Sequence, residues 1–122
     1  MFRIAYALLF AAVIALPAPS AVAANGYPER PIRVIVPFSP GGGTDLLGRA
    51  LQGKLEEALG TSIIIDKRPS AGGIVGVTLA AQAAPDGYTL LLTSASFTFA
   101  PSLYKDLAYD AVKDFKPITN VA

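Results

Sequence analysis

The stretch from Pro31 to Asp45, PIRVIVPFSPGGGTD, constrains the fold more than any other part of this sequence. Ile32 to Val36 form a nearly continuous run of β-branched and apolar side chains, which is typical of a buried parallel strand. Gly41 to Gly43 then allow a sharp turn whose backbone N–H groups can meet a ligand directly. From Asp45 to Leu59 the apolar spacing is helical. The stretch therefore predicts a strand, a glycine turn and a helix N-terminus, an arrangement that suits an anion.

The strand–loop–helix pattern recurs along the chain. We expect a second strand over Ser62–Asp66, a short helix over Ile74–Ala83 and a third strand over Tyr88–Leu92. Residues 115–121 are expected to begin a fourth strand. Alternation of strands and helices predicts the α/β class, with a parallel sheet and helices on its faces.

The sequence also indicates two details of the helices. Val75, Leu79 and Ala83 have the spacing of the inward face of the second helix. Pro101 and Ser102 could open a further short helix.

Three loops follow the carboxyl ends of the expected strands, where parallel sheets bind their ligands. They comprise residues 39–44, 68–73 and 93–96, and are built mainly from Gly, Ser, Thr and Ala. Their short side chains leave many N–H and O–H donors free for a ligand. The residues alone leave two readings of the triple glycine open, a site for a modest anion such as a carboxylate and a plain structural turn.

Nucleotide-binding motifs do not fit this glycine turn. A dinucleotide fingerprint that starts at Gly41 requires a third glycine where Leu46 stands. A P-loop requires a lysine at the helix start, where this sequence has Thr44 and then Asp45, a carboxylate that would repel phosphate. Asp45 is better read as a stabiliser of the helix N-terminus than as a catalytic acid.

Composition argues against an enzyme and against a cofactor. The sequence has no cysteine and no histidine, so thiolate metal sites, disulfides and the usual general base are all absent. The serines are therefore read as hydrogen-bond donors or caps rather than nucleophiles, and a small exported hydrolase that uses Ser94 or Asp45 is the weaker alternative. Ten basic and nine acidic residues give no basic stripe for nucleic acid.

The first residues have the three-part pattern of a secretory signal peptide. Arg3 supplies the positive start, residues 4–16 the apolar run, and Ala21 to Ala23 the small-residue cleavage site. We therefore assign residues 1–23 to a cleaved signal peptide and expect a periplasmic protein. An uncleaved membrane anchor is the alternative, although the apolar run is short for a span. Residues 24–30 are expected to form a loose N-terminal arm.

Five motifs in order give the sequence a family resemblance. They are YPERPI at residues 27–32, VPFSPGGGTD at 36–45, RPSAGG at 68–73, PDGYTL at 85–90 and YDAVKDF at 109–115. In this order and spacing the sequence resembles the start of the Bug family, the substrate-binding proteins of tripartite tricarboxylate transporters. The resemblance covers essentially the whole chain after the signal peptide.

The resemblance implies a two-lobed periplasmic binding protein of type II fold that closes on a small carboxylate. Family ligands include di- and tricarboxylates, acidic amino acids and aromatic acids, and the expected partners are the membrane subunits of the transporter. It implies a monomeric binding protein without a cofactor. Carried over by position, the ligand-binding residues are Phe38, Ser39, Gly41, Gly42, Gly43, Thr44, Asp45, Ser70, Ala71, Gly72, Gly73, Thr93, Ser94, Ala95 and Ser96.

The sequence departs from the family pattern at several positions. Ser70 stands where the family often has glycine, Ile74 where it has asparagine, and Ala100 where it commonly has asparagine before proline. The largest departure is length, because family members have two lobes. We assign residues 31–122 to the first part of the N-terminal lobe and expect the second lobe to be absent. A truncated fragment that has no function by itself is therefore an alternative.

Overall fold

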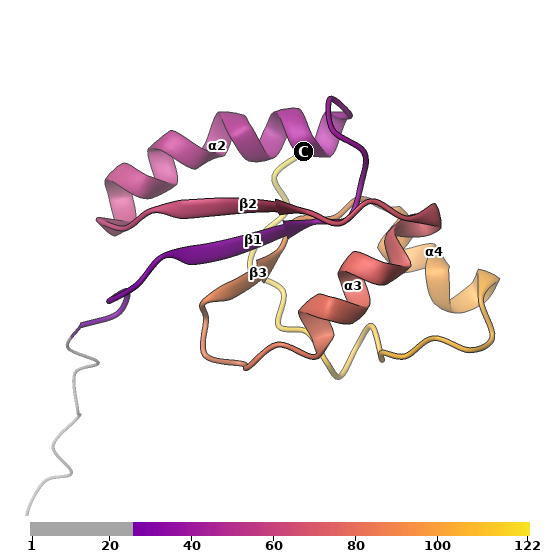
Figure 1. Ribbon diagram of the computed structural model, residues 1–122. Coiled ribbons are helices and arrows are strands. Elements are labelled where there is room, and N and C mark those ends of the chain that lie inside the picture. The colour runs from indigo at the N-terminus through magenta and orange to yellow at the C-terminus, as the bar shows by residue number, and fades with distance from the viewer. Residues whose placement is uncertain (1–25) are drawn as a thin grey trace, which may run out of the picture.

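The computed structural model describes residues 26–122, so the expected signal peptide lies outside the described residues. Figure 1 shows the order of the elements. They are β1 (Ile32–Val36), α2 (Gly43–Leu59), β2 (Ile63–Lys67), the 3₁₀ turn η1 (Ala71–Gly73), α3 (Ile74–Ala81), β3 (Thr89–Leu91) and α4 (Ser96–Leu103). The bounds of β1 agree with the expectation, and α2 begins two residues earlier than expected. None of the helices in residues 26–122 combines the length and apolar character that a membrane crossing requires.

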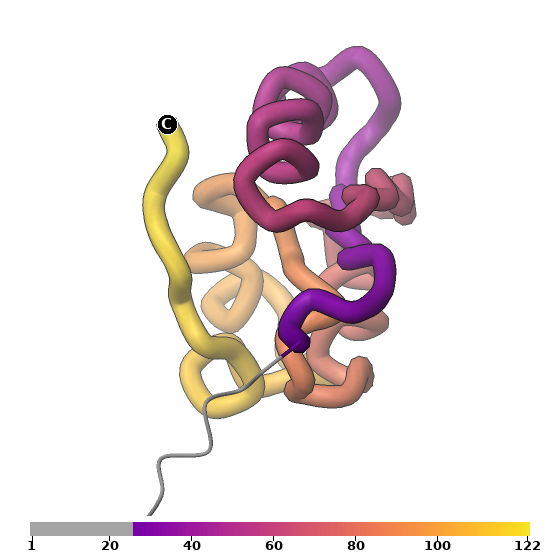
Figure 2. Tube along the Cα trace, turned by 90° about the vertical axis from the view of Figure 1, so that its left-hand side faces the viewer, coloured from indigo at the N-terminus to yellow at the C-terminus, as the bar shows by residue number. Residues whose placement is uncertain are grey.

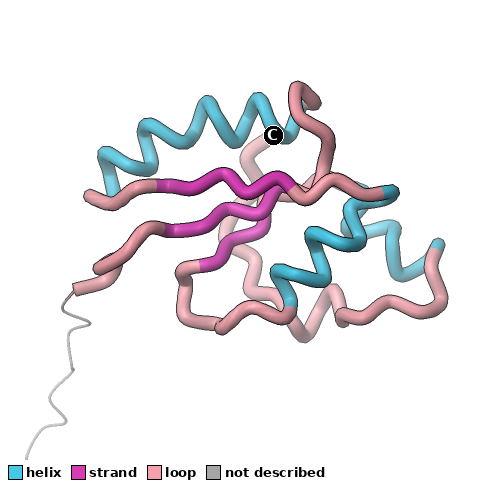
Figure 3. Tube along the Cα trace, viewed as in Figure 1, coloured by secondary structure: helices cyan, strands magenta, loops and turns pink. Residues whose placement is uncertain are grey.

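The three strands form one parallel sheet in the order β2-β1-β3 (Figure 3). In this register Ile32 lies opposite Ile63, and Val34 lies between Ile65 and Leu90. The expected α/β class with a parallel sheet is confirmed.

Helices cover both faces of the sheet, with α2 on one side and α3 on the other (Figure 1). The α2 face contains the main core cluster, in which Val34 and Val36 pack with Leu55 and Leu59 of the helix. Ile35 alternates to the opposite face, where Val77 of α3 is also fully buried. A continuous apolar strand such as β1 is the expected sequence for a strand that is covered on both faces.

The inward face of α3 differs from the expectation. Val75 is 53% exposed, whereas Gly76 and Val77 are buried. The reason is a close approach of the helix to Pro37, since a Cβ on Gly76 would lie 2.6 Å from Pro37 Cβ. Gly76 therefore lets the helix backbone lie directly on the end of β1, and the pattern of large apolar side chains does not mark this face.

The expected fourth strand is wrong. Residues 115–122 have no regular secondary structure, and Figure 2 shows this yellow segment beside the rest of the molecule rather than within the sheet. Cavities of 550 and 500 Å³ are lined both by Leu91 of β3 and by Ile118 of this segment. A ladder requires neighbouring strands about 4.8 Å apart. The segment has strand-like composition but forms no ladder with the three-stranded sheet of residues 26–122.

The last helix also differs from the expectation. α4 begins at Ser96, and Pro101 lies inside it rather than opening it. Pro101 is near the C-terminal end of the helix, so only one backbone hydrogen bond of a short helix is lost.

The expectation of a loose arm is wrong for residues 26–30. The Tyr27 hydroxyl donates to the Gly87 carbonyl at 2.6 Å, and the Glu29 N–H donates to the Tyr88 hydroxyl at 2.9 Å. Arg30 pairs with Asp86 at 2.8 Å and lies 4.1 Å from the centre of the Tyr88 ring. These contacts fix the chain that enters β1 onto the turn that precedes β3.

Two glycine-to-alanine substitutions test the close approach of α3. Gly76→Ala is expected to lower the free energy of unfolding by about 1–3 kcal/mol, the usual cost of forcing an extra carbon into a packed site. Gly53→Ala, at a position of α2 where an added Cβ meets nothing within 4 Å, is expected to raise it by up to about 1 kcal/mol. Urea unfolding of both variants gives the two values, and equal effects would contradict the packing described for Gly76.

Candidate functional site

The parallel sheet brings all three donor-rich loops to one rim. Residues 37–42 follow β1, residues 68–70 follow β2, and residues 92–95 follow β3, each at the carboxyl end of its strand. In Figure 3 all three leave the sheet at its right-hand end. The loops therefore share the edge at which open α/β sheets bind ligands.

The first and third loops meet in one cavity of 780 Å³ at this rim. Its walls include Gly43 and Thr44 at the start of α2, and Thr93, Ser94 and Ala95 before α4. Neither helix has a side-chain cap, because Gly42 and Ala95 are the N-cap residues. The first N–H groups of a helix have no i−4 partner within it. At α4 the Phe97 and Thr98 N–H groups donate to the Ser94 and Ala95 carbonyls at 3.0 Å, so the start of α2 is the helix end that offers donors to the cavity.

Hydroxyl groups add to these backbone donors. The Thr93 hydroxyl is buried and has no hydrogen-bond partner among the described residues. The hydroxyls of Ser94 and Ser96 lie 3.1 Å apart. None of the side chains that line the cavity within residues 26–122 is charged. The cavity can therefore hold a polar or anionic group through neutral donors.

The second loop does not line this cavity. The Ser70 hydroxyl accepts the Val75 N–H at 3.1 Å, so it caps the start of α3 instead of facing a ligand. Gly72 and Gly73 have φ values of 63° and 77°, which glycine adopts readily. A Cβ on Gly72 would lie 3.0 Å from the Tyr104 hydroxyl, and one on Gly73 would lie 3.4 Å from the Phe38 ring. The turn Ala71–Gly73 thus packs between the first loop and α4.

The rest of the first loop is held by internal contacts. The Ser39 carbonyl accepts the Gly42 N–H at 3.2 Å, and the Gly41 N–H donates to Asp45 Oδ2 at 2.8 Å. Phe38 is half-buried against Gly73. Of the residues expected to bind a ligand, those that line the cavity are Gly43, Thr44, Thr93, Ser94 and Ala95.

Asp45 is buried beneath the loop and does not line the cavity. Its side chain is 0% exposed, with Lys67 Nζ 3.4 Å from Oδ1 and Arg49 Nε 3.3 Å from Oδ2. The Gly41 N–H lowers the pKa of Asp45 most, and the charges of Arg49 and Lys67 lower it further against the opposing effect of burial. Asp45 is therefore an ionised carboxylate that fastens the glycine loop to α2 and β2.

Several cavity residues were not among those expected from the sequence. Leu47 follows Thr44 by about one helical turn, and its position could have been inferred from helical spacing. Leu91, Phe97 and the terminal residues 119–122 line the cavity only because of the tertiary arrangement. No sequence signal indicated that Lys67 reaches Asp45.

Residues 47–122 match the model of the tripartite tricarboxylate transporter family receptor. The chain belongs to this family. The match confirms the resemblance to the Bug proteins, which are receptors of this type.

Relatives and solved structures agree with the family assignment. A UPF0065 protein of Bordetella pertussis is 48% identical over 111 residues, covering 88% of this chain and 34% of the relative. The structure of the periplasmic binding protein BugD is 44% identical with a TM-score of 0.72, covering 75% of this chain and 31% of that one. The structure of MatC from Rhodopseudomonas palustris, solved with bound malate, is 39% identical with a TM-score of 0.68. The match covers 75% of this chain and 31% of MatC.

The chain spans about a third of the length of the curated relatives that it matches, for example 34% and 35% of two of them. Its small parallel sheet with helices matches part of the fold of these periplasmic binding proteins.

Acid is expected to destabilise the protein through its paired carboxylates. Burial opposes ionisation of Asp66, but hydrogen bonds from Arg33 and Arg68 outweigh it and hold the pKa below the ordinary 3.8, as for Asp45. A carboxyl with a lowered pKa in the folded state stabilises the fold above its unfolded pKa and loses that contribution as pH falls. Tm should therefore be steady between about pH 5 and 7 and fall below about pH 4.

Asp66→Asn tests the origin of this acid sensitivity. It is expected to lower Tm at neutral pH, because the ion pairs with Arg33 and Arg68 are lost. It is also expected to reduce the further fall of Tm in acid, because no Asp66 carboxylate remains to be protonated. Asp106→Asn serves as the matched control, because Asp106 is exposed and forms no ion pair within residues 26–122. An unchanged acid profile in Asp66→Asn, measured by thermal unfolding across pH, would contradict this assignment.

Proposed function

We propose that this chain supplies the first part of the ligand-binding lobe of a periplasmic receptor for small carboxylates. In this proposal residues 1–23 direct export, residues 31–122 form part of the lobe, and the receptor works as a monomer. It binds its solute without altering it and delivers it to the membrane subunits of a tripartite transporter. The candidate solutes are di- and tricarboxylates, acidic amino acids and aromatic acids.

The cavity at the rim carries the proposal. Gly43 and Thr44 at the start of α2 and Thr93 to Ala95 before α4 line one space. The first N–H groups of α2 have no partner within the helix and no side-chain cap. A carboxylate oxygen can accept several such hydrogen bonds, and bonds to a charged acceptor are stronger than neutral ones. A receptor must also release its solute, which favours neutral donors over a tight ion pair.

The comparisons support the same class of solute. The family is described as receptors of tricarboxylate transporters, and MatC was solved with malate bound. The third loop lies within residues 47–122, which match the family model.

Hydrolysis is not favoured by the arrangement at the rim. The recorded partner of the Ser94 hydroxyl in the described residues is another serine hydroxyl, which cannot serve as a general base. Asp45 is held by Lys67 and Arg49 beneath the loop, away from the cavity walls. Neither residue suggested for an enzyme is arranged for nucleophilic attack.

Calorimetric titration tests the proposed solute class. The protein from the complete reading frame that contains this sequence is titrated with malate, adipate, citrate, glutamate and benzoate, with glucose and Mg²⁺ as non-carboxylate controls. We expect binding of at least one carboxylate and no binding of the controls. Tight binding of a control together with no binding of any carboxylate would overturn the proposal.

Replacing one cavity hydroxyl then locates the binding. Thr93→Val keeps the shape of the side chain but removes its buried hydroxyl, and is expected to weaken carboxylate binding at least about tenfold, as for a lost hydrogen bond to a charged group. Thr78→Val on α3, away from the cavity walls, is the matched control and should leave affinity unchanged. Equal affinities of the two variants would place the carboxylate elsewhere.

A further inference from the structure

Asp45 occupies a helix position from which a carboxylate could block the proposed anion site. It is the third residue of α2, after Gly43 and Thr44, which line the cavity. Acidic side chains at this position commonly turn back to accept the free N–H groups at the start of their own helix. Such a conformation would place a negative charge at the helix end where an anionic solute would bind.

In the structure the Asp45 carboxylate binds the loop before the helix, and no hydrogen bond joins it to the N–H groups of Gly43 and Thr44 among the described residues. Its Oδ2 accepts the Gly41 N–H, one residue before the N-cap, and its Oδ1 lies 3.4 Å from Lys67 Nζ. Oδ1 has no hydrogen bond among the described residues, and its charged neighbour is the Lys67 ammonium group. The carboxylate is thereby held in a buried position between the loop and the sheet.

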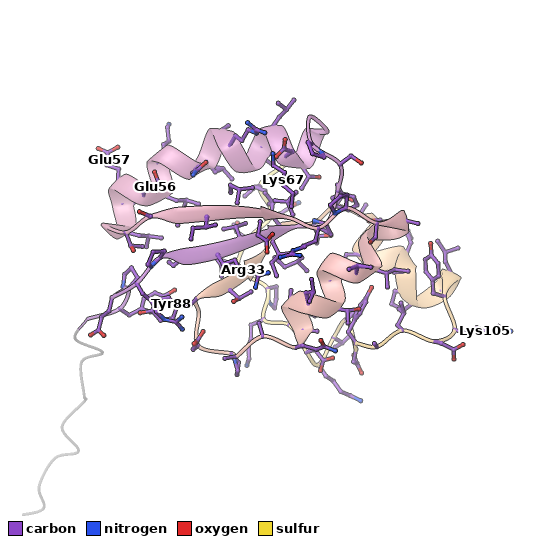
Figure 4. All side chains as sticks on the ribbon, viewed as in Figure 1. Arg33, Glu56, Glu57, Lys67, Tyr88 and Lys105 are labelled. Carbon is purple, nitrogen blue, oxygen red and sulfur yellow. The ribbon has the colours of Figure 1, made fainter. Side chains whose placement is uncertain are left out.

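Lys67 is well placed to hold this conformation. It is the last residue of β2 and extends on the face of the sheet that α2 covers, as Figure 4 shows. Its side chain is 28% exposed, whereas Arg49 is 57% exposed and belongs to the same helix as Asp45. The less exposed ion pair is less screened by solvent and joins two different elements.

We propose that Lys67 is a positioning residue that keeps the anion site vacant by holding the Asp45 carboxylate beneath the glycine loop. The inference rests on the proposed binding of a carboxylate at the rim cavity. Lys67 does not touch the solute in this account, since it is not among the residues that line the cavity. Without Lys67, Oδ1 loses its charged partner, and the carboxylate can turn to the N–H groups of Gly43 and Thr44, where it competes with the solute.

A pair of variants separates this role from a merely structural one. Lys67→Met is expected to weaken the binding of malate and adipate about five- to tenfold, the scale of a charge at a helix end. Adding Asp45→Asn to Lys67→Met should restore most of the affinity, because the neutral amide no longer competes as an anion and its oxygen can still accept the Gly41 N–H that holds the loop. Lys67→Arg, which keeps the cation, should bind normally.

Calorimetry gives the affinities and thermal unfolding verifies that each variant is folded. Equal affinity of Lys67→Met and the double variant would overturn the inference, whether both bind weakly or both bind normally. If Lys67→Met does not fold, Lys67→Gln with and without Asp45→Asn is compared in the same way, and equal affinities of that pair would contradict the account. Absence of any carboxylate binding by the unchanged protein would instead refute the proposed function and this inference with it.

Discussion

β1 pairs in parallel with β2 on one side and with β3 on the other, and every other feature of the rim depends on this pairing. Parallel strands end at the same edge, so the segments that follow them cannot be dispersed over the molecule. The glycine loop and the start of α4 therefore lie beside each other, although they are some fifty positions apart in the sequence. Burial of β1 under helices on both faces stabilises the pairing.

The rim combines neutral donors above with paired charges below. The start of α2 and residues 93–95 line the cavity with uncharged side chains, while the Asp45 carboxylate and its two cations lie beneath the loop. This separation lets the loop be held by ionic contacts without placing a fixed charge in the proposed binding space. An anionic solute would then be met by dipoles that the fold has already oriented, with little cost of rearrangement on binding.

Features decided by local residue chemistry were predictable from the sequence, and features decided by tertiary contacts were not. β1 and the end of α2 at Gly60 follow from a β-branched run and from the left-handed conformation that a helix-ending glycine adopts. Residues 115–121 resemble a strand, but a strand also requires a partner's backbone, which local sequence does not reveal. The inward face of α3 depends on Gly76 meeting Pro37, and the contact of Lys67 with Asp45 joins separate elements.

The central claim is that free N–H groups at adjoining strand ends bind a negatively charged solute. Two-dimensional ¹H–¹⁵N NMR of the full-length protein, titrated with malate, tests it residue by residue. We expect the largest shifts at the amides of Gly43 and Thr44 and at those of Ser94 and Ala95, with smaller changes at the opposite end of the sheet around Gly87. Saturable shifts confined to residues away from the rim would contradict the account.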